Sequence, residues 1–186
     1  GRNPVAVQKV IEAIGTYAPR MWTSVSNWVM TTAPRVVNWA ATNWDKVSDM
    51  AEVVKTKIVD AHNSAVIQSV VPPKYQSQVQ NTFDGWIQKT TLKEDMTVYR
   101  YTSWGYSGSS PWFTTNGSYT PDEARRLLAL PDSNAATTVT AYIIPAGTTI
   151  LIGKADSMVG ENYFGDYATG GGTQIYLPDP DDAIMQ

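Results

Sequence analysis

The sequence Gly170-Gly171-Gly172-Thr173-Gln174-Ile175-Tyr176-Leu177-Pro178 places a run of glycines directly before a short β-rich segment. The residues Gln174–Leu177 favour a strand, and Pro178 marks its end. A polar side chain, Gln174, therefore stands at the entry of the predicted strand, next to a glycine loop. Loops before such strands often carry functional residues, because a rigid scaffold positions them.

Further short β-rich runs lie between about Thr97 and this strand, separated by Gly, Pro, Ser and Asn. One short helix is predicted among them, with Thr120 as its N-cap and Pro121 in its first turn, ending before Pro131. This alternation predicts an α+β fold with a small mixed β-sheet in the C-terminal half. The predicted strands are Thr97–Thr102, Trp112–Thr114, Val139–Ile144, Thr149–Lys154 and Gln174–Leu177.

The chain from Pro4 to about Lys89 has the apolar spacing of helices. Over residues 35–70, apolar side chains recur at three, four or seven positions, which predicts a long amphipathic helix. Pro72 and Pro73 end this helix, since the residue before a proline is pushed out of the helical region. A shorter helix is predicted over Tyr75–Ile87. We therefore expect a helical region over residues 1–93, packed on a C-terminal domain over residues 94–186.

Four tryptophans lie within a short part of the helical region. One interpretation is a tryptophan-rich helical hairpin, packed on itself or on the C-terminal domain. The other is a delivery segment that contacts a membrane boundary, where tryptophan is favoured. The mixed charge of the polar face counts against simple membrane binding. The residues concerned are Trp22, Trp28, Trp39 and Trp44.

The amino-acid composition limits the kinds of functional site that the protein can have. The 186 residues are 42% hydrophobic and 17% charged, which fits a folded protein. There is no cysteine and a single histidine, His62, so disulfides, a cysteine nucleophile, a histidine triad and a zinc centre are excluded, and no metal is expected. Residues 96–186 contain four Lys/Arg against nine Asp/Glu, which disfavours general binding to nucleic acid.

The sequence contains the signal of neither a membrane span nor a signal peptide. No uninterrupted apolar run approaches the roughly 20 residues that a membrane span needs. The N-terminus lacks the charged start and apolar core of a signal peptide. Because the chain begins at Gly1-Arg2-Asn3-Pro4, we expect it to be cut from a longer carrier protein.

Arg100 lies in the middle of a predicted strand, between Tyr99 and Tyr101. Such an arginine can face solvent or pair with a carboxylate. Its planar guanidinium can also hold a phosphate with two parallel hydrogen bonds, which lysine cannot do. The loop Ser103–Ser110 is rich in hydroxyls and glycine and could wrap a ribose or a phosphate. It is not a Walker loop, and no βαβ unit surrounds the glycine run.

Two aromatic segments accompany this arginine. Trp112-Phe113-Thr114-Thr115 offers aromatic rings next to hydroxyls, either as core or as a surface that stacks on a flat cationic ring. The loop Asn162–Gly172 is long and aromatic, which is typical of a functional loop. Gln174 after it is neither a strong base nor a nucleophile, but it can hold a ribose hydroxyl or position water.

The order of Arg100, Trp112–Thr115 and Gln174–Pro178 resembles the ADP-ribosyltransferase superfamily, especially bacterial polymorphic toxin domains with that fold. The resemblance covers about residues 96–180 and implies an ADP-ribosyltransferase-like sheet with NAD as the substrate. It places Arg100 on the pyrophosphate, Phe113-Thr114-Thr115 in the aromatic-hydroxyl strand and Gln174 at the position of the catalytic Glu. Gly172 stands where the family has the Glu or Gln that helps to select an acceptor.

Glutamine in the last position resembles the NAD glycohydrolases of this superfamily, which pass ADP-ribose to water. On this basis the candidate catalytic residues are Arg100, Gln174 and Glu161, which could fold back to supply a carboxylate. The aromatic rings would pack on nicotinamide, and the loop over residues 161–172 would close over the site. The candidate NAD-binding residues are Tyr101, Ser103, Trp112, Phe113, Thr114, Tyr163 and Phe164.

The resemblance implies a secreted toxin domain that acts in competition between bacteria. It would be delivered into the cytoplasm of a target cell, deplete NAD there, and be neutralised by a cognate immunity protein over the NAD cleft. One alternative is a mono-ADP-ribosyltransferase that modifies a protein or an RNA. Another is a non-enzymatic membrane or interaction module, in which the tryptophan-rich helices carry the function.

Overall fold

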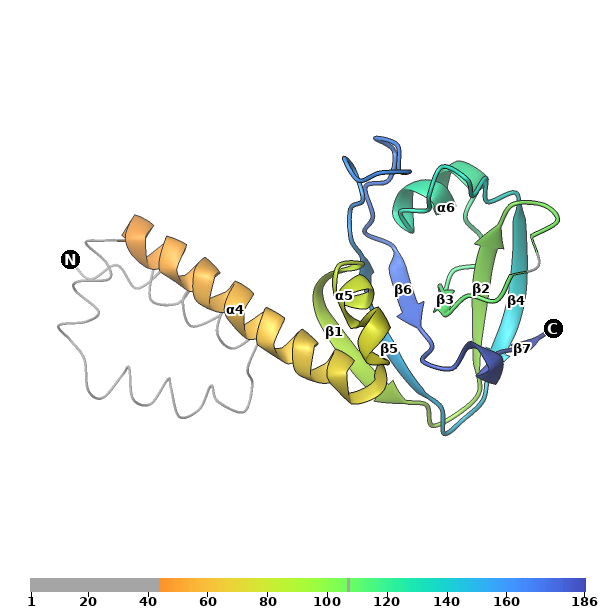
Figure 1. Cartoon of the computed structure of the whole chain (residues 1–186), viewed down its shortest axis with the longest axis horizontal. Coiled ribbons are helices and arrows are strands. Elements are labelled where there is room, and N and C mark those ends of the chain that lie inside the picture. Colours follow the sequence, from red (N-terminus) through yellow and green to blue (C-terminus); the bar gives the residue numbers. More distant parts are fainter. Residues whose placement is uncertain (1–43, 107) are drawn as a thin grey trace. The chain divides into compact units, whose positions relative to one another are not determined.

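Two prolines end the longest described helix at the predicted place. The computed structural model describes residues 44–106 and 108–186, and in it α4 spans Trp44–Val70, directly before Val71, Pro72 and Pro73. Pro73 then occupies the first turn of α5, Pro73–Gln80 (Figure 1). The helices predicted before residue 44, with Trp22, Trp28 and Trp39, lie outside the described residues.

Seven strands of the described part form two antiparallel sheets (Figure 1). The first has the order β1-β5-β6-β3 and the second the order β2-β4-β7, and every pairing is antiparallel, so the predicted mixed sheet is wrong. The α+β class is confirmed, as are the five predicted strands to within two residues. The bounds are β1 Phe83–Thr91, β2 Met96–Thr102, β3 Trp112–Phe113, β4 Thr138–Ile144, β5 Thr149–Ala155, β6 Thr173–Tyr176 and β7 Ile184–Met185.

The two sheets meet edge to edge through one backbone bridge. The amide of Tyr99 in β2 donates to the carbonyl of Thr114 at 2.8 Å, and the amide of Thr114 donates back to Tyr99 at 2.9 Å. Thr114 follows β3, whose two residues pair with β6. The bridge therefore brings the predicted arginine strand, the aromatic segment and the glutamine strand side by side.

The chain over Phe83–Ile87 is a strand, and the helix predicted there is wrong. Gly85 adopts φ +72°, and the pairing of β1 with β5 shifts register between Asp84 and Gln88. A regular strand would turn residues 83, 85 and 87 to one face, but in β1 only Phe83 and Ile87 are buried, and Gly85 at the bulge is exposed. A spacing of four between buried residues is also typical of a helix, which the sequence pattern could not distinguish from this bulged strand.

Chain contacts group the residues into two units, Gly1–Asp60 and Ala61–Gln186. The division between residues 93 and 94 stays a prediction, and β1 pairs with β5 inside the second unit. The end of α4 and α5 pack on the first sheet, where Ile67, Val71 and Val79 share a buried cluster with β1 and β5. A second buried cluster lies around Val98, Phe113 and Ile175, close to the predicted site.

Asn63 fixes the bulge of β1 to α4. It is only 6% exposed, and its side chain donates to the carbonyl of Gly85 at 2.7 Å and accepts from the amide of Ile87 at 2.9 Å. Asn63→Ala leaves both backbone groups without these partners. We expect the free energy of unfolding to fall by about 2–4 kcal/mol, measured by urea denaturation. Gln68→Ala, exposed on the same helix, is the control, and an equal effect of the two changes would contradict this role.

The helix α6, Pro121–Leu127, begins with the predicted N-cap. The amide of Glu123 donates to the hydroxyl of Thr120 at 3.3 Å, and the amide of Thr120 donates to the carboxylate of Glu123 at 2.9 Å. The helix ends three residues earlier than predicted, because Ala129 adopts φ +46°. This capping box holds α6 beside the site.

The capping box gives stability a pH dependence. The backbone amide of Thr120, and next its hydroxyl, lower the pKa of Glu123 from its ordinary value. A carboxylate with a lowered folded-state pKa stabilises the fold above the unfolded-state pKa, and this contribution is lost as the pH falls through the folded-state pKa. We therefore expect Glu123→Gln to lower the melting temperature at neutral pH and to match the wild type at about pH 2, by calorimetry. A constant difference would contradict it.

Within the described ranges, no helix is both long enough and apolar enough to cross a membrane.

Candidate functional site

The predicted segments converge on one pocket of about 550 Å³ in the second unit. It opens between β2, β3 and β6, and its other walls come from the chain after α6 and from the loops around residues 103–110 and 156–164. Seven of the ten predicted site residues line it. They are Arg100, Tyr101, Ser103, Trp112, Phe113, Phe164 and Gln174.

Arg100 lies against the rings of Phe113 and Tyr142, which contact each other edge-on at 5.3 Å between centres. It follows Val98 by two residues on β2, so its side chain faces the buried side of the sheet. The guanidinium carbon is 4.3 Å from the ring centre of Phe113 and 4.8 Å from that of Tyr142. One terminal nitrogen donates to the carbonyl of Ser110 and the other to the hydroxyl of Tyr142 at 3.4 Å. These contacts fix the plane of the guanidinium.

The third nitrogen of the Arg100 guanidinium is unpaired. Its Nε is buried and has no hydrogen-bond partner among the residues that the structure describes. Burial lowers the pKa of Arg100, and Tyr142 partly opposes this shift. Each terminal nitrogen of Arg100 carries a second N–H beyond the one that bonds Tyr142 or Ser110, and Arg100 lines the pocket, so the guanidinium can bind an anionic ligand there. A phosphate oxygen has the matching charge and the capacity to accept two such bonds.

Trp112 and Phe113 of the aromatic segment both line the pocket and both pack against the core. Phe113 is buried under Arg100, whereas Trp112 is half-buried and also lines the pocket. The ring of Trp112 contacts Tyr176 edge-on at 4.9 Å between centres, and Phe83 at 5.7 Å. Trp112 is therefore held in orientation by the core while one part of it reaches the pocket.

Gln174 is held by a single backbone carbonyl. It is 8% exposed, and its Nε2 donates to the carbonyl of Thr82 at 3.0 Å. The same carbonyl accepts from the amide of Asp156 at 3.0 Å. With its amide nitrogen committed to Thr82, Gln174 has its side-chain oxygen left to accept a hydrogen bond from a ligand hydroxyl.

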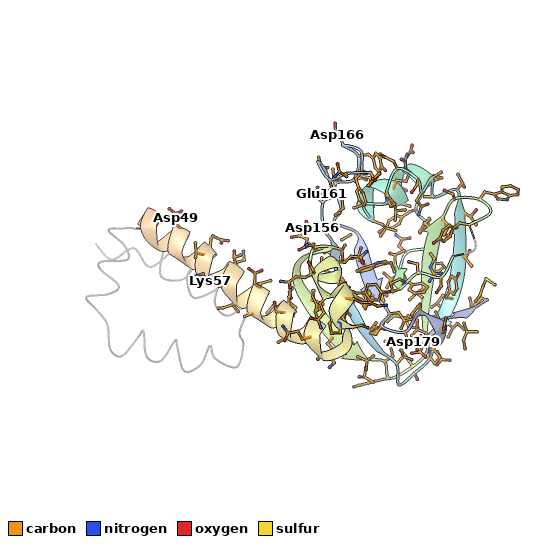
Figure 2. The ribbon with its side chains drawn as sticks, in the orientation of Figure 1. Asp49, Lys57, Asp156, Glu161, Asp166 and Asp179 are labelled. Carbon is orange, nitrogen blue, oxygen red and sulfur yellow. The ribbon has the colours of Figure 1, made fainter. Side chains whose placement is uncertain are left out.

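The pocket contains a carboxylate that the sequence analysis missed. Asp156, one residue after β5, lines the same pocket as Gln174, and its Oδ1 accepts from the amide of Ser157 at 2.7 Å. The sequence analysis predicts Glu161 as the source of this carboxylate. Figure 2 shows Glu161 and Asp166 farther along the loop than Asp156. The available sequence signal was that Asp156 directly follows β5, the strand that pairs with the strand of Gln174.

The structure does not bring Thr114, Glu161 and Tyr163 into the pocket. Thr114 is fully buried, and its backbone makes the bridge between the sheets. Glu161 is exposed, and Tyr163 is 84% exposed with φ +71°. Further missed lining residues are Gln78, Thr82, Tyr99, Thr102, Tyr106, Ser110, Leu128, Ala129, Leu130, Pro131, Ser133, Asn134, Asp156 and Met158.

The glycine run fastens the long loop to α6. The amides of Gly170 and Gly172 donate to the carbonyls of Arg126 and Leu127, at 2.9 and 2.8 Å. These carbonyls belong to the last turn of the helix, which lacks partners of its own. A Cβ on Gly170 would lie 2.5 Å from the carbonyl oxygen of Ala155, so the close approach requires glycine. The loop predicted to close over the site is thus fixed at its end.

The described residues contain no group of three or more His, Cys, Asp or Glu side chains placed to hold a metal ion. The cation in this pocket is Arg100, and the anion is Asp156. The arrangement can bind a ligand that carries both an anionic group and a flat or cationic group.

A comparison with solved structures shows a similarity of fold. The fold is similar to that of Tse6 in the solved structure of Tse6 in complex with Tsi6. The match has a TM-score of 0.52 and 16% sequence identity, and it covers 72% of this chain and 97% of the other. At this identity it shows a shared fold. No protein-family model and no curated protein matches the chain.

Proposed function

We propose that residues 61–186 form an ADP-ribosyltransferase-like domain that binds NAD and hydrolyses it to nicotinamide and ADP-ribose. The observation that carries this proposal is the pocket itself. It joins an arginine held against two aromatic rings to a fixed glutamine and a carboxylate. Arg100, the aromatic segment and Gln174 follow one another along the chain in the order that resembles the superfamily.

Arg100 would hold the pyrophosphate of NAD. Its guanidinium is already oriented by Phe113 and Tyr142, so little freedom is lost when a phosphate binds. The half-buried Trp112 would pack on the nicotinamide ring, which is flat and cationic. Gln174 would accept a hydrogen bond from a ribose hydroxyl and so set the sugar next to Asp156.

The reaction requires little acid–base help from the protein. The bond between nicotinamide and C1′ of the ribose breaks, and nicotinamide leaves as a neutral base with the bonding electrons. Positive charge develops on the ribose, and the Asp156 carboxylate would stabilise it. Water then adds to C1′ and releases one proton, giving ADP-ribose. Positioning and electrostatics are sufficient when the leaving group is already good.

Hydrolysis fits this site better than transfer to a macromolecule. Glu161, which was expected to fold back and supply a carboxylate in either reaction, is exposed and lies outside the pocket. Gly172 is buried against the carbonyl of Leu127, so it presents no side chain that could select an acceptor. Water needs no selection, and it reaches an open pocket freely.

The biological setting we propose is that of a secreted toxin delivered by a larger carrier into the cytoplasm of a competing cell. The shared fold supports a protein partner, because Tse6 is found in complex with Tsi6. A neutralising partner would cover the pocket. Trp104 is 88% exposed in the loop that supplies Ser103 and Tyr106 to the pocket wall, and exposed aromatic residues are common anchors of interfaces.

The fate of ADP-ribose tests the type of reaction. The purified chain is incubated with NAD labelled in the adenosine part, with and without a cell lysate, and the products are separated by chromatography and by gel. We expect free ADP-ribose in both samples, in equal amount to nicotinamide. A labelled protein or RNA band that appears with the lysate, with little free ADP-ribose, would show a transferase. Intact NAD in both samples would favour the interpretation as a non-enzymatic module.

A further inference from the structure

One wall of the pocket is a loop segment without regular structure that is anchored at both ends. The segment Leu128–Asn134 follows α6 and lines the pocket along most of its length. Non-glycine residues adopt left-handed backbone near both of its ends, with φ +46° at Ala129 and +51° at Ala136. Such conformations are costly and persist only where the surroundings hold them. The wall therefore depends on contacts from outside the segment.

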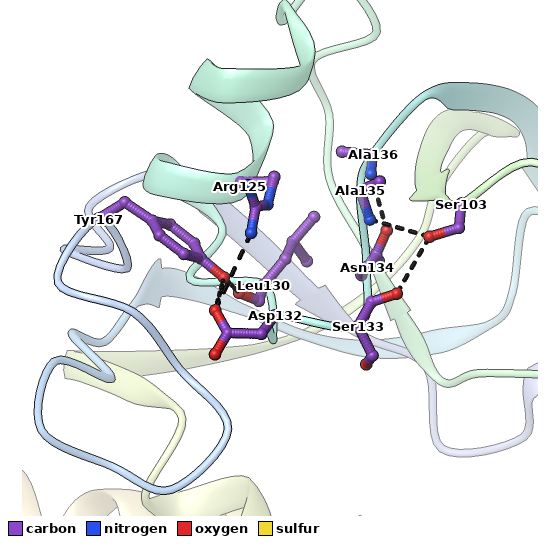
Figure 3. A network of polar contacts seen from close by, with 9 residues as sticks. All are labelled: Ser103, Arg125, Leu130, Asp132, Ser133, Asn134, Ala135, Ala136 and Tyr167. Carbon is purple, nitrogen blue, oxygen red and sulfur yellow. Dashed lines mark hydrogen bonds and ion pairs between the residues drawn. The ribbon is translucent and has the colours of Figure 1, made fainter.

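The end of the wall next to α6 is held by Tyr167 from the long loop (Figure 3). Its hydroxyl lies 2.9 Å from the carbonyl oxygen of Leu130 and 3.0 Å from Oδ1 of Asp132. The guanidinium of Arg125 stacks on the ring of Tyr167 at 4.2 Å and approaches Oδ1 of Asp132 at 3.9 Å. The amide of Asp132 also donates to the carbonyl of Tyr163 at 2.8 Å.

The far end of the wall is held by Ser103, which follows β2 directly (Figure 3). The hydroxyl of Ser103 donates to the carbonyl of Ser133 at 3.1 Å and accepts from the amide of Ala135 at 2.9 Å. The side chain of Asn134 reinforces this end by donating to the carbonyl of Tyr101 at 3.0 Å. Both hydrogen-bonding roles of the Ser103 hydroxyl are thus used by the wall and not by a ligand.

We propose that Ser103 and Tyr167 are positioning residues that hold Leu128–Asn134 as a fixed wall of the NAD pocket. The wall faces the same space as Arg100 and Gln174, so its position sets the width available to the ligand. A pocket formed in advance binds without the entropy cost of ordering a loop. The long loop, in this view, acts as a clamp on the wall and does not close over the ligand.

We predict that substitution of either positioning residue weakens the binding of NAD and leaves the rate of its cleavage nearly unchanged. Ser103→Ala removes both hydrogen bonds of the Ser103 hydroxyl, and Tyr167→Phe removes the hydroxyl but keeps the ring under Arg125. We expect each variant to raise the KM for NAD about five- to tenfold, the effect of losing roughly one net hydrogen bond, with kcat within about twofold. Ser103→Thr keeps the hydroxyl and should restore KM.

A second readout is independent of NAD. Hydrogen exchange of the free protein, followed by NMR, should show faster exchange at the amide of Ala135 in Ser103→Ala, and at the amide of Asp132 in Tyr167→Phe. The exposed Ser118→Ala and the exposed Tyr75→Phe, which do not line the pocket, are the matched controls and should change neither readout.

The two readouts separate this inference, which rests on the proposed function, from that function. Unchanged exchange at both amides would overturn the clamp whatever the kinetics show. A fall in kcat at constant KM would also overturn it, because the residues would then act in the chemistry. If the wild type does not hydrolyse NAD, the proposed function fails, and the exchange data alone decide whether Ser103 and Tyr167 hold the wall.

Discussion

Arg100→Lys is expected to lower kcat/KM for NAD by about 100-fold or more, which corresponds to roughly 3 kcal/mol. Lysine keeps the charge but not the planar group that lies against Phe113 and Tyr142. It also lacks the fork of donors that engages Ser110 and Tyr142 and has further N–H groups for the ligand. The loss should be seen mainly as weaker binding, because the arginine is assigned to the pyrophosphate and not to the breaking bond.

The measurement is steady-state nicotinamide release, together with NAD binding by calorimetry. Arg126→Lys is the matched control, since Arg126 is exposed on α6 and outside the pocket; its activity should stay within about twofold of the wild type, as for most surface changes. Melting temperatures show whether Arg100→Lys is folded. A folded Arg100→Lys variant that retains more than half of the activity would contradict the assigned role.

Gln174→Glu should nearly abolish turnover, by about 100-fold, because the amide has two roles at once. Its nitrogen donates to the carbonyl of Thr82, and its oxygen is left for the ligand. A carboxylate cannot donate, so it would face the Thr82 carbonyl with negative charge and share the pocket with Asp156. We expect a loss of stability of about 1–3 kcal/mol from this unmade bond.

The pH dependence of this variant has a defined sign. A protonated glutamic acid can donate to Thr82, so the stability difference between Gln174→Glu and the wild type should shrink as the pH falls. Urea denaturation at several pH values measures it, with Gln88→Glu, exposed on β1, as the control. A Gln174→Glu protein as active as the wild type would refute the need for an amide and would favour the transferase interpretation.

The sequence predicted the strands that line the pocket better than it predicted the other walls of the pocket. The strand of Arg100, the aromatic segment and the strand of Gln174 were each found from local patterns of β-favouring residues and turn residues. Their convergence depends on the bridge between Tyr99 and Thr114, which is a long-range contact with no local signal. The resemblance to a known order of motifs supplied what periodicity could not.

The errors have physical causes in particular residues. The bulge at Gly85 leaves the buried residues of β1 four positions apart, as in a helix, so the strand was not predicted. The amide of Asp156 donates to the carbonyl of Thr82, which is more than 70 residues away along the sequence. Local sequence patterns therefore could not predict that Asp156 lines the same pocket as Gln174. Ser103 was expected to touch the ligand, but its hydroxyl is engaged by the backbone at Ser133 and Ala135, which only the folded chain reveals.

The most direct test of the central claim is the release of nicotinamide from NAD by the purified chain alone, followed by chromatography. The wild type is compared with Arg100→Ala, Gln174→Ala and the surface control Arg126→Lys. We predict rapid release by the wild type and the control, and loss of release in both pocket variants while they remain folded. Intact NAD after prolonged incubation with folded wild-type protein, or equal release by all four proteins, would contradict the account.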